Sequence, residues 1–293
     1  MSVLILGAGA YGLALSHSLK CEVYVYSSLS KEIDLLNRTR KSKLFDVKFG
    51  SNIHFVSSID FDYDLIILAL PTSIIVSELS KLNLKDVPII IASKGIVDDK
   101  FIYDIIDFLD NPKYVLSGPS FAKDMINNDN IVLTLAGCSE LDIFNDNIKL
   151  EYTDDIVGVL VCGVVKNIFA IACGMLRGMG VSDSTFSAFL NLVINEAKCI
   201  LSDLGDVNTI FLSCGLGDII LTCTCSNSRN YTFGYLIGSS SRKVDKYLSS
   251  NTVEGVSTLK SLKGRINNDL INLIYDIVFN NVDSIELLKY IVK

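Results

Sequence analysis

The sequence predicts an α/β domain with a Rossmann-like sheet, followed by a second domain that is entirely helical. Three observations support this fold class. Short apolar segments rich in β-branched residues alternate with helical stretches in the first half of the chain, which is typical of βαβ units. A glycine-rich turn follows the first of these segments, and long helical segments replace the alternation from about Asp154.

Two domains are expected, because a chain of 293 residues is long enough for each of two domains to bury its own core. We place the boundary in the polar run Glu151–Asp154, which gives a dinucleotide-binding domain at residues 1–152 and a helical substrate or catalytic domain at residues 153–293. The strands expected in the first domain form a parallel sheet; they are Val3–Leu6, Glu22–Tyr26, Ile53–Val56, Leu65–Leu70, Pro88–Ala92, Tyr114–Leu116 and Ile131–Leu135.

The second domain is expected to begin with two long helices, at Asp154–Met179 and Ser184–Leu204. The stretch Ile156–Met179 is near the ~20 residues needed to cross a bilayer, so a single-span membrane protein is one alternative. Lys166 and Asn167 lie at its centre, and a lysine at mid-bilayer costs at least ~2.5 kcal/mol on the insertion scale. The sequence therefore favours a buried helix of a soluble protein, without membrane insertion.

The composition excludes several classes of protein. Apolar residues make up 49% of the chain, which argues against disorder, and the net charge of −7 argues against a nucleic-acid partner. Cys223 and Cys225 are too close together for ordinary zinc ligands, so we expect no metal. Other cysteines, such as Cys162 and Cys173, lie in apolar helical runs, so we expect all eight to be reduced. The N-terminus reaches Gly7 without a signal-like apolar stretch, so we expect a cytoplasmic protein.

The segment Gly7-Ala8-Gly9-Ala10-Tyr11-Gly12 is the clearest motif in the sequence. It follows the first expected strand directly and opens an apolar helix. Glycines in this pattern allow a tight turn, close approach of a pyrophosphate and close helix packing, while the helix N-terminus supplies N–H groups to the anion. The motif therefore predicts NAD or NADP as a cofactor.

The end of the second expected strand normally reads the adenosine ribose, and an acidic residue there favours NAD. This chain has Tyr26-Ser27-Ser28 at that point. Without a carboxylate a 2′-phosphate is not repelled, yet no Arg or Lys stands at that point to attract it. Lys31, Arg38 and Arg40 could fold back toward it, and the alternative is that they are solvated. The choice stays open, with a lean to NADPH.

Lys166 is the best candidate for a catalytic base. Both histidines, His17 and His54, lie outside every motif, and burial in an apolar helix disfavours a charged lysine. A second cation from Lys94, in the turn Ser93-Lys94-Gly95, would lower the pKa of Lys166 further, whereas Asp218 would hold the ammonium and raise that pKa. The sequence leaves open which effect is larger. The alternative is a lysine whose head group reaches water.

Arg229, in the segment Asn227-Ser228-Arg229-Asn230, offers a planar donor fork suited to a phosphate group. Ser228 and Asn230 add neutral hydrogen-bonding groups. The alternative is an exposed loop arginine. For Asp218 the structural alternative is a helix N-cap after Gly217.

Seven segments together resemble bacterial-type NAD(P)-dependent glycerol-3-phosphate dehydrogenase, in the same order along nearly the whole chain. They are GAGAYG (7–12), SKG (93–95), SGPSFAKD (117–124), GVVKNIFAIACG (163–174), GLGDIILTC (215–223), SNSRNYTFG (226–234) and VEG (253–255).

The resemblance implies the 6-phosphogluconate dehydrogenase-like fold and a small phosphorylated substrate. It makes Lys166 the base, with Lys94 and Asp218 beside it in the catalytic group. The substrate contacts it implies are Lys94, Gly118, Ser120, Lys166, Asp218, Ser228, Arg229 and Asn230. The cofactor contacts, which join Gly7, Gly9 and Gly12, are Ala10, Tyr11, Ser28, Lys94, Ala122, Arg229, Thr252 and Glu254.

This reading predicts an enzyme that interconverts sn-glycerol 3-phosphate and dihydroxyacetone phosphate and supplies glycerol 3-phosphate for phospholipid synthesis. The chain departs from the family at Leu192-Val193, where an Arg-Gly pair is usual, and at Tyr231-Thr232, which are often basic. Alternatives are a lysine-based β-hydroxy acid dehydrogenase or ketopantoate-type reductase, and a non-catalytic nucleotide-binding sensor. A homodimer is one assembly that the sequence leaves open.

Overall fold

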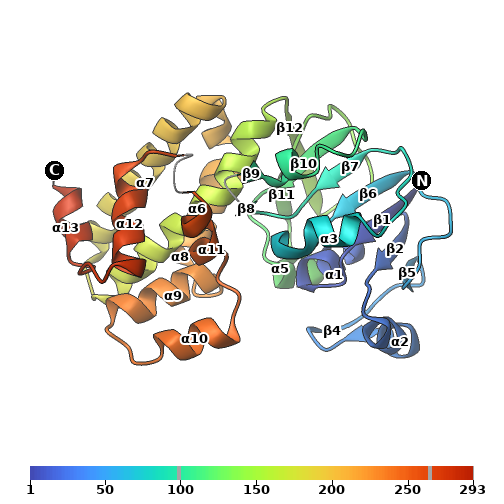
Figure 1. The fold of residues 1–293 in the computed structure, drawn as a ribbon, viewed down its shortest axis with the longest axis horizontal. Coiled ribbons are helices and arrows are strands. Elements are labelled where there is room, and N and C mark those ends of the chain that lie inside the picture. The colour runs from blue at the N-terminus through green and yellow to red at the C-terminus, as the bar shows by residue number, and fades with distance from the viewer. Residues whose placement is uncertain (98–99, 263–265, 293) are drawn as a thin grey trace. The chain divides into compact units, whose positions relative to one another are not determined.

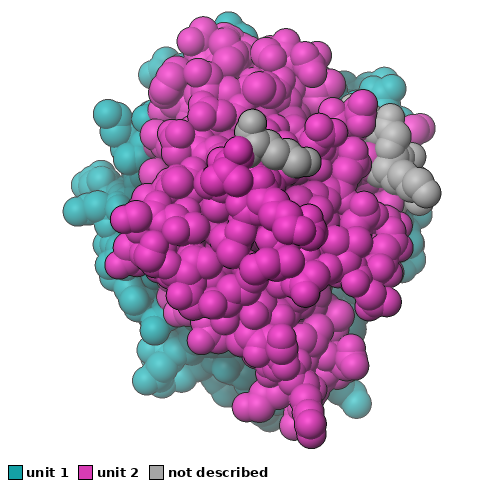
Figure 2. All heavy atoms as spheres, turned by 90° about the vertical axis from the view of Figure 1, so that its left-hand side faces the viewer, with its two compact units in different colours: residues 1–93, 102–156 teal, residues 94–101, 157–293 magenta. Residues whose placement is uncertain are grey.

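The computed structural model describes residues 1–97, 100–262 and 266–292, and the chain divides into two compact units (Figures 1 and 2). Unit 1 contains residues 1–93 and 102–156, and unit 2 contains residues 94–101 and 157–293. The expected boundary lies within the last strand of unit 1. The segment at residues 94–101, which the sequence places in the first domain, groups with the helical unit.

Unit 1 is built on an eight-stranded sheet of order β12-β11-β10-β7-β6-β1-β2-β5. Its strands are β1 (Ser2–Leu6), β2 (Glu22–Tyr26), β5 (Ile53–Val56), β6 (Leu65–Leu68), β7 (Ile89–Ile91), β10 (Lys113–Ser117), β11 (Ile131–Ala136) and β12 (Ile148–Thr153). All neighbours pair in parallel except β10 and β11, which are antiparallel. The predicted fold class is confirmed, while the wholly parallel sheet is wrong at this one pairing.

Strand β12 is absent from the sequence-based expectation, which read its last residues as a polar boundary. Its sequence IKLEYT alternates apolar with polar residues, as a half-buried edge strand does, and it pairs along its full length with β11. Two short hairpins, β3–β4 (Lys41–Ser42 and Phe45–Lys48) and β8–β9 (Ile96–Val97 and Lys100–Phe101), complete the strands that the structure describes.

Three helices of unit 1 pack against the sheet through a shared core. Helices α1 (Ala10–His17), α2 (Ser30–Thr39) and α5 (Ala122–Ile126) share one core cluster with inward residues of β1 and β2. The connection after β6 forms η1 (Thr72–Ile74) and α3 (Ile75–Leu79), and α4 (Ile102–Ile105) lies further along the chain. Strand β1 lies between β2 and β6, so successive strands are added to one side of β1 first and then to its other side. Ligands of open α/β sheets bind at the carboxyl ends of strands at such a point.

Unit 2 consists mainly of helices (Figure 1). They are α6 (Ile156–Gly178), α7 (Asp183–Leu204), η2 (Val207–Phe211), the turn η3 (Ser213–Gly217), α8 (Asp218–Thr224), α9 (Arg229–Gly238), α10 (Val244–Ser250), α11 (Glu254–Ser261), α12 (Asp269–Phe279) and α13 (Glu286–Ile291). Helix α6 is long and apolar enough to cross a membrane, yet 89% of its most apolar window is buried inside the structure. It therefore serves as the core helix, as the sequence predicted.

Helices α6 and α9 approach each other closely through glycines. A Cβ on Gly174 would lie 2.0 Å from the carbonyl oxygen of Tyr231, and one on Gly234 would lie 1.9 Å from that of Ile171. A backbone carbonyl inside a helix cannot move away to make room for a side chain, so both positions require glycine. The contact fixes α9, and therefore Arg229 and Asn230 at its start, against the helix that carries Lys166.

Candidate active site

The centre of the site in unit 2 is an ion pair between Lys166 and Asp218. Lys166 lies in the middle of α6, where apolar neighbours exclude water, and Asp218 is the first residue of α8. Both residues are buried, and the Lys166 Nζ donates a hydrogen bond to Asp218 Oδ2. The lysine head group therefore does not reach water. Asp218 is also not an N-cap, because Gly217 occupies that position.

Lys94 is the second cation at this carboxylate. Its Nζ lies 3.4 Å from the same Oδ2 of Asp218, and its side chain is 17% exposed. The turn that carries it contains Gly95 at φ +134°, a conformation that favours glycine. The other oxygen of Asp218 accepts a hydrogen bond of 3.3 Å from the Thr222 hydroxyl. One buried carboxylate thus holds two ammonium groups. The sequence predicted these three residues together but not that both lysines share one oxygen.

The pKa of Lys166 falls to about 8 from its usual 10.5. Burial is the main cause, the charge of Asp218 opposes it, and the charge of Lys94 lowers the pKa further. Desolvation therefore outweighs the favourable ion pair. A lysine with this pKa has both its neutral and its charged form accessible near neutral pH, which suits general acid–base chemistry.

Asn167, the residue after Lys166, belongs to a hydrogen-bond network that links α6 to α9 and α11. The Asn230 Nδ2 donates to Asn167 Oδ1 at 2.8 Å, and the backbone N–H of Gly255 donates to Asn230 Oδ1 at 2.8 Å. The Asn167 Nδ2 donates to Glu254 Oε2 at 3.3 Å. The sequence-based site omits Asn167, although its polarity inside an apolar helix was the signal.

The predicted phosphate-binding segment, residues 227–230, forms the start of α9. The Ser228 hydroxyl caps this helix by accepting from the N–H of Tyr231 at 3.3 Å, and Asn230 is turned into the amide network. Arg229 is the exposed member, with 52% of its side chain accessible and its Nη2 3.9 Å from Glu254 Oε1. Thr252, also predicted, is exposed just before α11.

In unit 1 the glycines of the first turn have three separate functions. Gly7 has φ +120°, and a Cβ on Gly12 would lie 2.0 Å from the Gly7 carbonyl oxygen. Gly9 caps α1, and a Cβ there would meet no protein atom within 4 Å. The turn therefore needs its first and third glycines for packing and leaves open space at the second. Such a cradle at a helix N-terminus fits a dinucleotide pyrophosphate.

The turn after β10 lies beside this cradle. The Tyr11 hydroxyl, on α1, and the Ser120 hydroxyl are 3.1 Å apart. Gly118 has φ +145°, and a Cβ there would lie 3.1 Å from Leu133 Cα. Ala122 begins α5, which packs on α1. The Ser117 hydroxyl, next to this turn, is buried without a hydrogen-bond partner. Unit 1 thus brings together Ala10, Tyr11, Gly118, Ser120 and Ala122.

Ser28, two residues after β2, contacts a carboxylate that the sequence-based site omits. Its hydroxyl lies close enough to the Glu78 carboxylate of α3 to lower the pKa of that group, and Glu78 accepts a hydrogen bond from Lys81 Nζ at 2.7 Å. Arg40 is turned elsewhere, since its guanidinium donates to the Gly50 carbonyl oxygen and lies 5.2 Å from the centre of the Phe55 ring.

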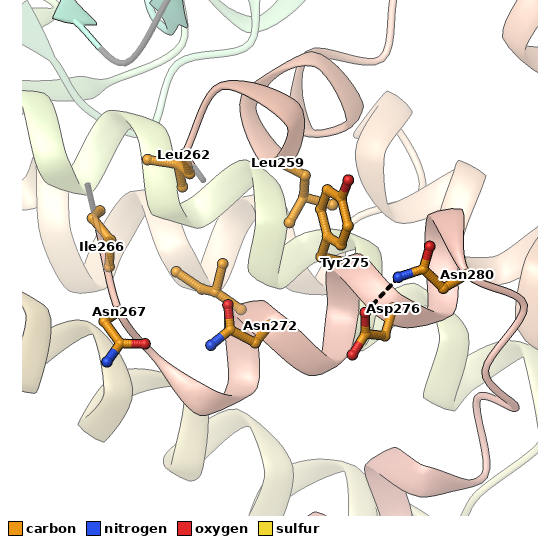
Figure 3. Close-up of a pocket in the computed structure, with 9 residues that line it drawn as sticks. Leu259, Leu262, Ile266, Asn267, Asn272, Tyr275, Asp276 and Asn280 are labelled. Atoms are coloured by element: carbon orange, nitrogen blue, oxygen red, sulfur yellow. Dashed lines mark hydrogen bonds between the residues drawn. The ribbon is translucent and has the colours of Figure 1, made fainter. Parts of the chain in front are cut away.

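A cavity of about 450 Å³ lies between α11 and α12 in unit 2 (Figure 3). Leu259, Leu262 and Ile271 line it, and Asp276 and Asn280 are hydrogen-bonded to each other at its edge. None of the predicted site residues lines this cavity. Within the described residues, no group of three His, Cys, Asp or Glu side chains could hold a metal ion, and the eight cysteines are free thiols.

Comparison with known proteins gives the same result for both halves of the chain. Residues 2–142 match the family model described as NAD-dependent glycerol-3-phosphate dehydrogenase N-terminus, and residues 155–289 match the model of its C-terminus. A glycerol-3-phosphate dehydrogenase [NAD(P)+] of Wolbachia pipientis is 32% identical, with 100% of both chains covered. One from Ehrlichia chaffeensis is also 32% identical, covering 96% of this chain and 97% of the relative.

Solved structures agree on the fold. The glycerol-3-phosphate dehydrogenase of Coxiella burnetii superposes with a TM-score of 0.89 at 22% identity, covering 100% of this chain and 98% of that one. A probable 2-dehydropantoate 2-reductase of Bacillus subtilis superposes with a TM-score of 0.58 at 17% identity, covering 95% and 99%.

Proposed function

The chain belongs to the NAD-dependent glycerol-3-phosphate dehydrogenase family, and we propose that Lys166 moves the hydroxyl proton in its reaction. The enzyme is an NAD(P)-dependent oxidoreductase that interconverts sn-glycerol 3-phosphate and dihydroxyacetone phosphate. We propose that it supplies glycerol 3-phosphate for phospholipid synthesis. The observation that carries the assignment of Lys166 is its buried ion pair with Asp218, which Lys94 shares.

Oxidation of a secondary alcohol removes a hydride from carbon and a proton from oxygen, and the nicotinamide, when bound, accepts the hydride. Neutral Lys166 takes the proton. In the reverse direction its ammonium form polarises the ketone and returns the proton to the oxygen. Asp218 holds the Lys166 Nζ in one orientation, while burial, with a smaller effect from Lys94, keeps the pKa low enough for the neutral form to exist.

The dinucleotide would be held in unit 1 at the cradle described above. The space beside Gly9 and the N-terminus of α1 fit a pyrophosphate, and the side chain of Tyr11 lies at the same end of the helix. The predicted cofactor contacts in unit 1 are Gly7, Gly9, Ala10, Tyr11, Gly12, Ser28 and Ala122. Those in unit 2 are Lys94, Arg229, Thr252 and Glu254, and the contacts in both units stay predictions.

We propose that Arg229 binds the phosphate of the substrate. It is the exposed cation of its segment, whereas Ser228 and Asn230 hold the start of α9 in place through the contacts described above. Gly118 and Ser120 would contact the substrate from the turn after β10. Glu254 lies near enough to Arg229 to orient it and to offset part of its charge.

An absorbance assay of reduced-nicotinamide oxidation with dihydroxyacetone phosphate tests this function, with ketopantoate and a β-keto acid as competing substrates. We expect turnover with the phosphorylated ketone only. Turnover with the carboxylate substrates instead would favour the ketopantoate-type alternative. Cofactor binding with no turnover of any substrate would favour the nucleotide-binding sensor.

Localisation and assembly are also proposals. We place the enzyme in the cytoplasm, where a reducing environment keeps cysteines as free thiols. Fractionation of the native host would test the compartment. For the assembly we propose a homodimer, which light scattering of the purified chain would distinguish from a monomer. The net charge of −7 argues against a nucleic-acid partner, and a doubly charged substrate would need local cations such as Arg229 to attract it.

A further inference from the structure

The end of β2 lacks a carboxylate in the sequence, but the structure brings one there from another element. We propose that Glu78, on α3, recognises the adenosine ribose and makes this chain prefer NAD(H) to NADP(H). The inference rests on the proposed dinucleotide site and reverses the lean to NADPH drawn from Ser28 alone.

The topology places Glu78 at the edge where a dinucleotide binds. In the sheet register Leu6 of β1 lies opposite Tyr26 of β2 and Leu68 of β6, so the three strands end at one level. The segment that continues from β6 forms α3. Its Glu78 lies near Ser28, just past the carboxyl end of β2, which is the usual position of the acidic residue that binds the ribose hydroxyls.

The carboxylate is held in place and stays ionised. The Glu78 side chain is 11% exposed, its Oε1 accepts a hydrogen bond from Lys81 Nζ at 2.7 Å, and the Ser28 hydroxyl lies close by. The hydrogen bond from Lys81 lowers the pKa of Glu78 against the opposing effect of burial, and the nearby Ser28 hydroxyl lowers it further. Burial and the charge of Glu78 together raise the pKa of the Tyr26 phenol, as expected for a charged group beside the end of β2.

Two carboxylates near the end of β2, those of Glu32 and Glu78, disfavour a 2′-phosphate there. Glu32 places a second carboxylate oxygen 3.4 Å from the Ser27 hydroxyl, and the ammonium of Lys81 is committed to Glu78. Arg40, one of the three cations that the sequence offered, binds the Gly50 carbonyl oxygen instead. A ribose 2′-hydroxyl can donate to a carboxylate, whereas a 2′-phosphate carries close to two negative charges and is repelled.

A structural role for Glu78, tying α3 to β2, would be visible in stability but not in the choice between two cofactors. Glu78→Gln and Lys81→Met form a matched pair, because each removes the same ion pair. Glu78→Gln removes the anion from the ribose site, while Lys81→Met leaves the anion unpaired. If Glu78 reads the ribose, the two variants must change the NADH to NADPH ratio in opposite directions.

The experiment measures dissociation constants for NADH and NADPH with the full-length chain, by isothermal titration calorimetry or by fluorescence of the reduced nicotinamide. The chain has no tryptophan, so protein emission does not interfere strongly. We expect the wild type to bind NADH more tightly, Glu78→Gln to reduce that preference about 10-fold, and Lys81→Met to increase it.

Three outcomes would overturn the proposal: tighter binding of NADPH by the wild type, an unchanged ratio in Glu78→Gln, or the same shift in both variants. Thermal melting of each variant checks that it folds. If Glu78→Gln does not fold, Glu78→Asp replaces it, because it keeps the charge but draws the carboxylate back by one methylene. Binding is read without turnover, so a chain that shows the expected ratios but does not reduce dihydroxyacetone phosphate would refute the proposed function alone. A chain that binds neither cofactor would refute both.

Discussion

The ammonium of Lys166 and that of Lys94 converge on a single carboxylate oxygen, the Oδ2 of Asp218. Two cations at one anion leave a net positive charge in a buried place. Burial lowers the pKa of Lys166, the charge of Asp218 opposes this effect, and the charge of Lys94 lowers the pKa further. The arrangement provides a proton acceptor in a site where neither histidine of the chain lies.

Replacing Lys166 by methionine should lower kcat by a factor of about 10² to 10⁴, the usual contribution of general acid–base catalysis. Lys94 still pairs with Asp218 in this variant, so the carboxylate is not left without a cation. Steady-state kinetics measure the loss, and calorimetry should show that cofactor binding is retained. Turnover close to that of the wild type would exclude Lys166 as the base.

Replacing Asp218 by asparagine should lower the pKa of Lys166 below about 8, because the group that raises it is gone while Lys94 remains. In the direction of alcohol oxidation, kcat/KM rises with pH as Lys166 becomes neutral, and this rise should move to lower pH in the variant. The pH profile of kcat/KM measures it. Thr222→Val, which removes only the hydrogen bond to Asp218 Oδ1, is the control and should move the profile much less.

The stability of the chain should also depend on Lys166. Its pKa is about 8 in the folded chain and near 10.5 when unfolded, so between these values the unfolded chain holds the extra proton. The free energy of unfolding therefore gains a favourable contribution as pH rises from about 8 to 10.5, and loses it as pH falls through about 8. Urea unfolding at several pH values, compared with Lys166→Met, isolates this contribution. Parallel curves for the two proteins would show that the pKa is not lowered.

Replacing Arg229 by alanine should raise the KM for dihydroxyacetone phosphate roughly 10- to 100-fold, since a charged hydrogen bond to phosphate is lost. The control is Arg242→Ala, which removes another exposed arginine of the same unit. Kinetics with both variants measure the difference. Equal KM values would mean that the phosphate is bound elsewhere.

The sequence predicts those parts of the site whose signal is local. Lys166 is conspicuous because it interrupts an apolar helix, and the glycines at positions 7, 9 and 12 immediately follow a strand. The sequence indicates only one member of the amide network. Asn167 adjoins Lys166, but its partner Asn230 comes 63 residues later, so the pairing has no local signal. The roles assigned to these residues stay predictions until variants are measured.

Features that depend on pairing between distant segments could not be read from the sequence. Glu78 comes far along the chain from Ser28 and sits in a short helix, so only the topology after β6 brings the two together. The antiparallel pairing of β10 with β11 has no local signature either, because both strands are short apolar runs. Strand β12 is different, since its alternating pattern was present and was outweighed by the polar residues that follow it.

The second and third glycines of the first turn should respond differently to alanine. A Cβ on Gly9 meets no protein atom, and its φ of −68° suits any residue, so Gly9→Ala should leave the melting temperature nearly unchanged. The added methyl group fills the space where a pyrophosphate would approach the backbone, so dinucleotide affinity should fall by at least about 10-fold. Gly12→Ala instead drives a Cβ to 2.0 Å from the Gly7 carbonyl oxygen and should lower the melting temperature. Thermal melting and NADH titration of both variants test this contrast. If Gly9→Ala bound NADH as tightly as the wild type, the space beside Gly9 would not be the pyrophosphate site.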